Sequence, residues 1–197
     1  RHFQRCDHVL AVSKYSLDYI KHNFNLSDIK TWNVIYNPIE ESFLNKTEPV
    51  NNDDVLFIGK LTETKGCYSL IKAFNSCAES NLNLHLKLVG KGNETMVREL
   101  IDPRYIDRVH FLGYCDRERL KKEVDTCAFA CIPSYFESFG MVAIEVMSRN
   151  RTIVYTDRTS ARELMTDKVE GYLVNPENIE EIIHRIKELL SSHKLRD

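Results

Sequence analysis

The chain has 197 residues, of which 43% are hydrophobic and 28% charged, and its formal net charge is −2. This length and composition are typical of a globular protein with one α/β domain, or one domain and part of another. The charge gives no global electropositive bias, so we do not expect a nucleic-acid partner. No apolar run is as long as a membrane-spanning helix requires.

The cysteines and the first residues bear on the compartment. The chain begins with Arg1 and shows no signal peptide, so we expect that residues precede it in the natural protein. The six cysteines are Cys6, Cys67, Cys77, Cys115, Cys127 and Cys131. They form no Cys-x-x-Cys pair and no zinc-finger spacing, so we expect free thiols in a reducing, cytoplasmic compartment. Glycosylation triplets at Asn25, Asn45 and Asn93 are patterns that arise often by chance.

Apolar runs typical of strands alternate along the chain with amphipathic stretches typical of helices. The first part reads as a strand at 8–12, a helix at 14–23, a strand at 32–36 and a polar linker or surface loop at 45–54. Strands are then expected at 55–58, 84–89, 109–112, 128–132, 152–155 and 171–174. They alternate with helices at 68–80, 94–100, 116–124, 140–148, 161–165 and 179–193.

This alternation predicts an α/β fold, a Rossmann-like parallel sheet with helices on both faces. The strands are continuous apolar runs rather than alternating ones, which agrees with burial on both faces. Parallel sheets of this kind bind ligands beyond the carboxyl ends of their strands. We therefore expect the loops after residues 58, 89, 112, 132 and 155 to share one rim and to carry the chemistry.

The loop after the strand 55–58 contains Gly59, Lys60, Lys65 and Gly66. Lysines at a strand–helix junction can neutralise a diphosphate, and Gly66 can open the helix beside it. The loop lacks the Gly-Lys-Ser/Thr of a Walker A motif. A solvated surface loop is the alternative interpretation.

Three further rim loops give weaker signals. Gly90-Lys91-Gly92 begins like a dinucleotide fingerprint without its third glycine, and a tight turn explains it equally well. Tyr114 is placed to stack on a base or to cover the sheet edge, and Asp116 is expected to cap a helix. The loop 156–163 is polar and suits either a ligand cover or a helix cap.

The segment 133–145 contains the strongest indications of function in the sequence. Glu137 precedes the helix, and the backbone N–H groups of Gly140, Met141 and Val142 are expected to face the rim, where the helix dipole favours an anion. Glu145 lies further along the same helix among apolar residues.

A carboxylate among apolar residues requires a partner. A pair of ligand hydroxyls would suit Glu145, and an ion pair with Arg149, four residues later, is the structural alternative.

The spacing of Glu137 and Glu145, with seven residues between them, resembles the E-x7-E motif of retaining GT-B glycosyltransferases, most closely family 4, the glycosyl transferases group 1. Other segments follow that family's order: 6–13, 34–39, 57–61 with 65–66, 88–92, 111–113 and 170–176. The resemblance implies that residues 1–50 are the end of the N-terminal domain and the interdomain crossover. Residues 51–197 would be the C-terminal domain that binds the nucleotide sugar.

The resemblance also implies roles. Glu137 would contact the transferred sugar as the catalytic residue, Glu145 the ribose hydroxyls, Lys60 and Lys65 the diphosphate, and Tyr114 would lie near the base. The implied donor-binding set is Gly59, Lys60, Lys65, Gly90, Tyr114, Ser138, Phe139, Gly140, Met141, Val142 and Glu145, without a metal ligand.

Two departures from the family pattern matter. Lys60 stands where the family often has Arg, which loses the bidentate fork. Thr159-Ser160 stand where the family often has Gly-Gly, which puts the usual role of that loop in doubt, although Glu163 matches the family.

The implied reaction transfers a hexose from a UDP- or GDP-type nucleotide sugar to an acceptor hydroxyl, with retention, in polysaccharide or glycolipid synthesis. No metal or other cofactor is expected, since the sequence has no Asp-x-Asp pair. The acceptor, a glycan or a lipid, would bind through a missing N-terminal domain, so the fragment alone is expected to be inactive. Peripheral attachment to the inner face of a membrane is left open. The alternatives are a nucleotide-sugar epimerase and a non-catalytic nucleotide-sugar-binding or interaction domain.

Overall fold

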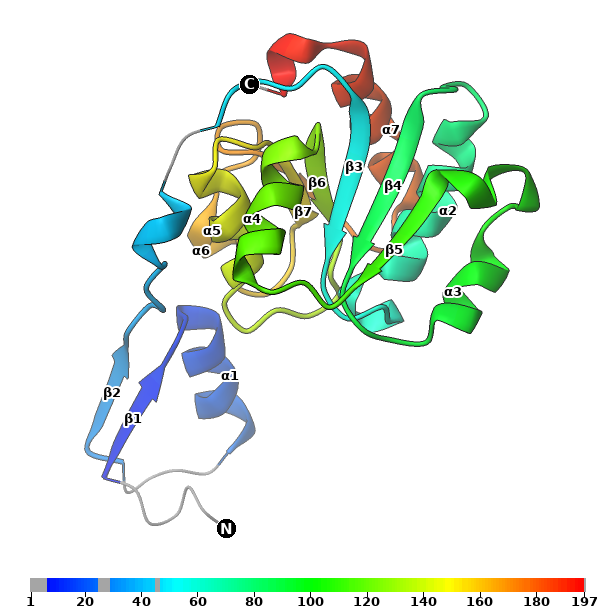
Figure 1. Ribbon diagram of the computed structural model, residues 1–197. Coiled ribbons are helices and arrows are strands. Elements are labelled where there is room, and N and C mark those ends of the chain that lie inside the picture. Colours follow the sequence, from blue (N-terminus) through cyan, green and yellow to red (C-terminus); the bar gives the residue numbers. More distant parts are fainter. Residues whose placement is uncertain (1–6, 25–28, 45–46, 197) are drawn as a thin grey trace.

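The computed structural model describes residues 7–24, 29–44 and 47–196 (Figure 1). Cys6 and the glycosylation triplets at Asn25 and Asn45 fall wholly or partly outside these residues. The chain forms a small two-stranded sheet near its beginning and a larger six-stranded sheet. In Figure 1 the small sheet lies beneath the larger one, on the side where strand β3 ends.

The first part, here called the N-terminal unit, contains β1 (His8–Ala11), α1 (Lys14–Asn23) and β2 (Thr31–Val34). The strands of the larger sheet are β3 (Asp53–Ile58), β4 (Leu84–Val89), β5 (Val109–Gly113), β6 (Phe129–Ile132), β7 (Ile153–Thr156) and β8 (Tyr172–Val174). Its helices are α2 (Cys67–Ala78), α3 (Glu94–Leu100), α4 (Arg117–Thr126), α5 (Met141–Ser148), α6 (Ala161–Leu164) and α7 (Ile179–Ser191). Short 3-10 turns are η2 (Glu41–Phe43), η3 (Glu63–Lys65), η4 (Pro103–Arg108) and η5 (His193–Leu195).

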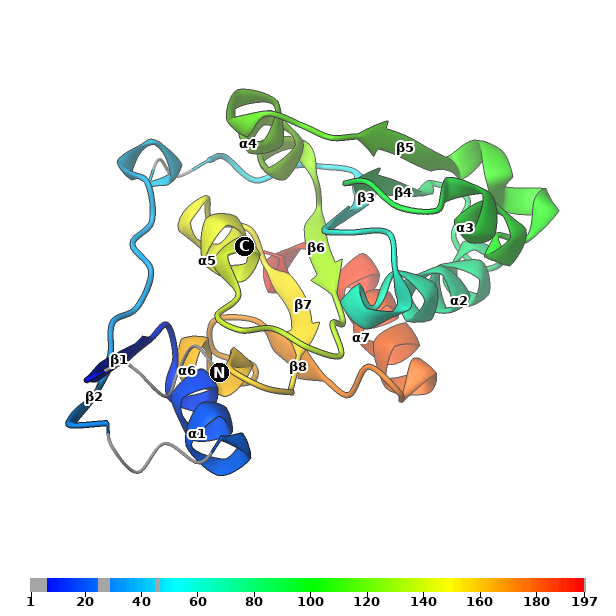
Figure 2. The ribbon, with the colours of Figure 1, turned by 90° about the horizontal axis from the view of Figure 1, so that it is seen from below.

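All neighbouring strands of the larger sheet are parallel, in the order β5-β4-β3-β6-β7-β8. The chain builds outward from β3 to β5, then returns to the other side of β3 with β6. Helices α2, α3 and α7 cover one face and α4 and α5 the other (Figure 2). The predicted fold class is confirmed. The order of strands reverses between β3 and β6, and in such sheets that point is where ligands bind.

The core of the larger sheet follows from its apolar strands. Every residue of β6 is buried, as is β3 from Val55 to Ile58, because helices cover both faces. Each predicted strand and helix has a counterpart in the structure, and Asp116 caps α4 as expected by accepting a hydrogen bond from the Arg119 N–H.

The predicted loop at 45–54 is wrong in its last two residues, because β3 begins at Asp53. Two carboxylates at the start of a strand look like loop residues in the sequence. Here the Asp53 carboxylate accepts hydrogen bonds from Arg196 and Asn81, each at 2.9 Å. Asp54 forms an ion pair with Lys87 at 2.7 Å. These partners offset the cost of placing the carboxylates in a sheet.

The N-terminal unit has a small core of its own. Strands β1 and β2 pair in parallel, and the buried side chains of Val9, Ala11 and Leu17 lie between these strands and α1. On the other face Leu10 is 64% exposed. This unit therefore buries far less apolar surface than the larger sheet.

The cysteines of the described part of the chain are all buried and unpaired: Cys67, Cys77, Cys115, Cys127 and Cys131. Burial raises the pKa of Cys67 to about 12 and that of Cys77 to about 11. These thiols pack as small core residues. No helix of the described part is long and apolar enough to cross a membrane.

Candidate active site

The loops that follow β3 and β6 meet at the point where the strand order reverses. The Tyr135 N–H donates a hydrogen bond to the Thr64 carbonyl at 2.9 Å. Gly66, the N-cap of α2, has φ 74°, and a Cβ there would lie 2.0 Å from the Pro133 carbonyl oxygen. Only glycine permits this backbone conformation and this close approach together. The two loops therefore form one rigid rim.

Glu137 and Lys65 meet across this rim. Lys65 Nζ lies 2.9 Å from Glu137 Oε2 and 3.3 Å from the Phe136 carbonyl oxygen. The Ser134 hydroxyl donates to the other carboxylate oxygen at 2.8 Å. The side chains of Lys65 and Glu137 are 30% and 16% exposed, so the pair is accessible but partly screened from water. Both oxygens of Glu137 are thereby fixed in direction.

The N-terminus of α5 points its free amides into the same region. Gly140 is its N-cap with φ 98° and has no side chain that could cap the helix. Among the described residues nothing accepts a hydrogen bond from the N–H groups of Gly140, Met141 and Val142. The buried Tyr155 hydroxyl would lie 2.4 Å from a Cβ at Gly140, so a side chain there would displace the helix end. Free amides and the positive end of the helix dipole favour an anion at this position.

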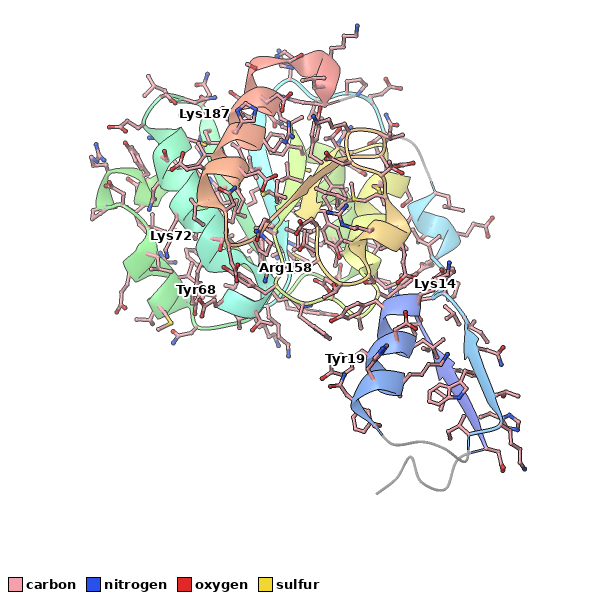
Figure 3. The ribbon with its side chains drawn as sticks, turned by 180° about the vertical axis from the view of Figure 1, so that it is seen from behind. Lys14, Tyr19, Tyr68, Lys72, Arg158 and Lys187 are labelled. Atoms are coloured by element: carbon pink, nitrogen blue, oxygen red, sulfur yellow. The ribbon has the colours of Figure 1, made fainter. Side chains whose placement is uncertain are left out.

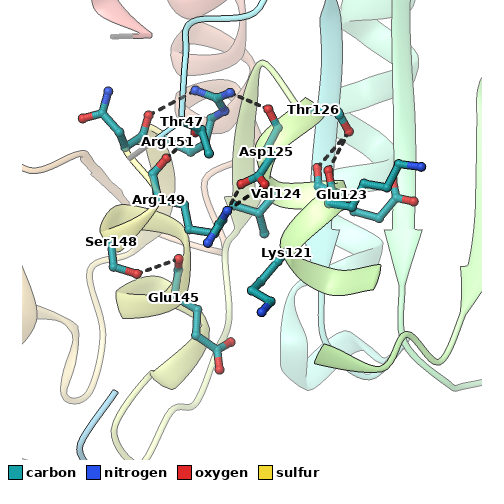
Figure 4. Close-up of polar contacts among 12 residues, drawn as sticks. Thr47, Lys121, Glu123, Val124, Asp125, Thr126, Glu145, Ser148, Arg149 and Arg151 are labelled. Carbon is teal, nitrogen blue, oxygen red and sulfur yellow. Dashed lines mark hydrogen bonds and ion pairs between the residues drawn. The ribbon is translucent and has the colours of Figure 1, made fainter. Parts of the chain in front are cut away.

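Glu145 lies on α5 and is buried enough that desolvation raises the pKa of its carboxyl group, with Arg117 opposing the rise and Glu40 adding to it. The structural alternative, an ion pair between Glu145 and Arg149, is wrong. Arg149 instead binds both oxygens of the Asp125 carboxylate, and the Glu145 carboxylate points away from it (Figure 4). Within the described residues no group donates a hydrogen bond to the Glu145 carboxylate.

The remaining predicted residues occupy the same rim. The Gly59 N–H donates to the Val89 carbonyl at 2.9 Å, and the Gly90 N–H to the Gly113 carbonyl at 2.8 Å, so strand pairing continues into the loops. Lys60 is exposed beside Gly59. Tyr114 is 71% exposed. Its ring centre lies 5.6 Å from Lys91 Nζ.

Ser138 and Phe139 contact the N-terminal unit. The Ser138 carbonyl accepts hydrogen bonds from Ser13 and Ser16 of α1. The Phe139 ring is buried and stacks on Tyr36, which follows β2, with ring centres 5.7 Å apart. Both residues therefore join the site to the first part of the chain.

Thr159 and Ser160, which stand where the family often has Gly-Gly, support the loop that carries Glu137. Thr159 Oγ1 accepts a hydrogen bond from the Glu137 N–H at 3.1 Å. The Ser160 hydroxyl donates to the carbonyls of Glu137 and Phe139, at 3.3 and 3.0 Å. Their hydroxyls hold the loop that carries Glu137, a role that two glycines cannot perform. In the sequence, this supporting role was indicated only by the polar character of the loop 156–163, which was predicted to lie at the rim.

Comparison with known proteins assigns the family. Residues 38–197 match the family model described as glycosyl transferases group 1. The chain belongs to this family. The rim described above lies within the matched residues, and the match favours a glycosyltransferase over the epimerase alternative.

Curated relatives of this group 1 chain are also glycosyltransferases. It is 30% identical over 203 residues to a diphospho-undecaprenol 4-alpha-N-acetylgalactosaminyltransferase of Campylobacter jejuni, covering 98% of this chain and 53% of that protein. It is 30% identical over 213 residues to an uncharacterized glycosyltransferase of Methanocaldococcus jannaschii, with 99% of this chain and 53% of the relative covered. The chain thus spans about half the length of these relatives.

Solved structures agree on the fold. Anabaena HepE, crystallised with UDP and glucose, superposes with a TM-score of 0.81 at 22% identity, over 97% of this chain and 55% of that one. The GT-B type of architecture is therefore shared with a protein of low sequence identity.

Proposed function

We propose that this chain is the donor-binding part of a retaining family 4 glycosyltransferase that moves a hexose from a UDP- or GDP-type nucleotide sugar to an acceptor hydroxyl. The observation that carries the proposal is the convergence of Glu137, Lys65 and the free amides of α5 where the strand order reverses. An anion and a polar, hydroxyl-bearing group can be held side by side at such a point.

In this scheme the diphosphate lies at the N-terminus of α5. Lys60 and Lys65 supply positive charge, and the amides of Gly140 and Met141 supply hydrogen bonds. As the bond between sugar and phosphate breaks, negative charge grows on the leaving diphosphate, and these fixed groups stabilise it. Glu137, held beside Lys65, accepts hydrogen bonds from hydroxyls of the transferred sugar. Lys65 thus bridges the carboxylate and the phosphates.

Glu145 is proposed to bind the two ribose hydroxyls of the donor. A carboxylate is an acceptor with two oxygens, which matches two neighbouring hydroxyl donors. Its burial without a hydrogen-bond donor among the described residues supports this assignment, because the ligand would supply the missing hydrogen bonds. Exposed Tyr114 is proposed to lie near the base.

The wider role is proposed from the relatives. The name of the Campylobacter protein describes a transferase that acts on a diphospho-undecaprenol-linked sugar. We infer that the present enzyme acts in glycan or glycolipid synthesis. Its acceptor would bind mainly through parts of the protein outside this chain, and the enzyme would work in the cytoplasm, at or near the inner face of a membrane. The chain by itself is expected to transfer little or no sugar.

The test is the thermal stability of the protein with UDP, GDP, ADP and their sugar conjugates. One nucleotide at about one hundred times its Kd should raise the Tm by about 5–10 °C. Glu145→Ala should lose most of that rise. Glu137→Ala should keep the rise and abolish transfer in the full-length protein. Glu99→Ala, an exposed carboxylate of α3, is the matched control and should change neither.

Two outcomes would count against the proposal. If no nucleotide stabilises the full-length protein, the donor assignment fails. If a nucleotide binds but full-length protein with intact Glu137 transfers no sugar from any conjugate, the chain is a non-catalytic binding domain.

A further inference from the structure

Glu163, a residue of the short helix α6, caps a helix that is remote in the sequence. Its carboxylate accepts hydrogen bonds from the backbone N–H groups of Lys14 and Tyr15, each at 2.8 Å, through one oxygen apiece. Figure 3 places Lys14 at the end of α1 that meets the larger part of the molecule. A carboxylate at this end of a helix is favourable, since it satisfies two unpaired donors and faces the positive end of the dipole.

The same helix end binds the loop of the candidate site. The hydroxyl of Ser13, which is fully buried, donates to the Ser138 carbonyl at 2.7 Å. The Ser16 hydroxyl donates to the same carbonyl at 3.0 Å. Ser138 directly follows Glu137 in the chain. We call these contacts of Ser13, Lys14, Tyr15 and Ser16 with Ser138 and Glu163 the α1 joint.

The short segment 160–163 thus binds both α1 and the loop that carries Glu137. Ser160, at the start of α6, donates to the Glu137 and Phe139 carbonyls, and Glu163, on the same helix, holds α1. A shift of α1 away from Glu163 must therefore strain or break the two serine bonds to Ser138. The position of the N-terminal unit and the position of the Glu137 loop are mechanically linked.

We propose that Glu163 is a positioning residue for transfer: by capping α1 it aligns the Glu137 loop with the N-terminal unit. This inference rests on the proposed function. None of the groups proposed to hold the nucleotide makes a contact in the α1 joint; these groups are the side chains of Lys60, Lys65 and Glu145 and the amides of Gly140 and Met141. Loss of the cap therefore acts on the step that involves Glu137 and leaves nucleotide affinity in place.

The experiment compares Glu163→Gln with Glu170→Gln in the full-length protein. Glu170 is an exposed carboxylate that follows α6, and among the residues the structure describes it accepts only a local hydrogen bond, from the Thr166 N–H. In Glu163→Gln the amide group still accepts one N–H but presents its own donors to the other, and the negative charge is lost. Glu163→Asp keeps the charge with a shorter reach and should fall between Gln and the parent.

Hydrogen exchange reports on the joint without any need for turnover. In Glu163→Gln, the amides of Lys14 and Tyr15 should exchange about tenfold faster, which is the effect expected when a helix loses a capping group. The peptide covering residues 134–139 should also exchange faster. Glu170→Gln should leave both segments unchanged.

Kinetics then separate positioning from folding. We expect kcat of Glu163→Gln to fall at least about tenfold, since small misplacements of a reacting group are costly, while the donor KM stays within about twofold. Faster exchange in α1 with no change at residues 134–139 would overturn the proposal, as would an unchanged kcat or a donor KM that rises in parallel. Failure of the parent protein to bind any nucleotide would sink the proposed function, and the exchange result would still decide whether Glu163 controls the loop.

Discussion

At the scale of single residues, Glu145 shows that a binding residue can be unfavourable for the stability of the free protein. Most carboxylates of this chain have partners, as Asp53, Asp54 and Asp125 do. Glu145 is half-buried on α5 and receives no such support from the described residues, which is why burial raises the pKa of its carboxyl group. A group held in an unfavourable state in the free protein is poised to gain from a ligand.

Because the Glu145 carboxylate is half-buried without such a partner, we expect Glu145→Gln to raise the stability of the free protein and to weaken nucleotide binding. Because the native pKa is raised above the ordinary value of 4.5, the native state holds the proton more tightly than the unfolded state. The stabilisation is therefore complete below the ordinary value and is lost as the pH rises through the native pKa. At neutral pH the neutral glutamine avoids the buried charge, so the Tm should rise by about 1–3 °C.

The measurement is a series of thermal unfolding curves from acid to neutral pH, with Glu99→Gln as the exposed control. The gain of Glu145→Gln should shrink towards zero below the ordinary value of 4.5. Its nucleotide-induced stabilisation should fall at the same time. A Tm that drops at neutral pH would show that the Glu145 carboxylate has a stabilising partner.

At the scale of elements, the site depends on how closely two loops approach. The loop after β3 and the loop after β6 pack so tightly that Gly66 has no room for a side chain. Lys65, the residue before it, is thereby brought to Glu137. The residues of the E-x7-E motif thus form only part of the site. The close packing of the loops after β3 and β6 adds Lys65 to it.

Gly66→Ala and Gly113→Ala form a matched pair that isolates this packing. Both residues have positive φ, 74° and 65°, but a Cβ at Gly113 meets nothing within 4 Å. Gly113→Ala should cost only the left-handed backbone, about 1–2 kcal/mol of unfolding free energy. Gly66→Ala should cost at least about 2 kcal/mol more, since the backbone at Pro133 must move. Urea unfolding measures both, and equal losses would contradict the close approach.

The elements were predictable because their signals are local. Continuous apolar runs indicated the strands, and Asp116 indicated the start of α4, which it caps. Sequence order also predicted that Lys65 and Glu137 share a rim, and the structure brings them into contact. Thr159 and Glu163 escaped prediction as supports of the site, because their partners lie 22 and 149 positions away and depend on tertiary packing. The start of β3 escaped for the same reason, since Arg196 stabilises Asp53 from the far end of the chain.

At the scale of the whole molecule, the chain consists of two parts of unequal stability. The larger sheet has a continuous core, whereas the N-terminal unit buries only a few apolar side chains around Val9, Ala11 and Leu17. The α1 joint and the contacts of Ser42 and Thr47 hold the unit against the larger sheet. Arg149, for example, donates to the Ser42 carbonyl and its own carbonyl accepts from Thr47.

We therefore expect local opening of the N-terminal unit before global unfolding. Backbone amides of β1 and β2 should exchange at least roughly tenfold faster than those of β3 and β6 in this chain. Hydrogen exchange followed by mass spectrometry resolves the two sets. Equal protection would mean that the chain unfolds as one cooperative unit.

The burial of the cysteines has a practical consequence for watching this opening. Thiol-reactive dyes attack the exposed thiolate, and Cys67 and Cys77 are both buried and hard to ionise at neutral pH. With Cys6 replaced by serine, a cysteine placed at Leu82, which is 83% exposed, and another at Tyr19, 49% exposed, would be the preferred labelling positions. A fluorophore pair attached there would report the separation of α1 from the larger sheet in single molecules, with and without nucleotide.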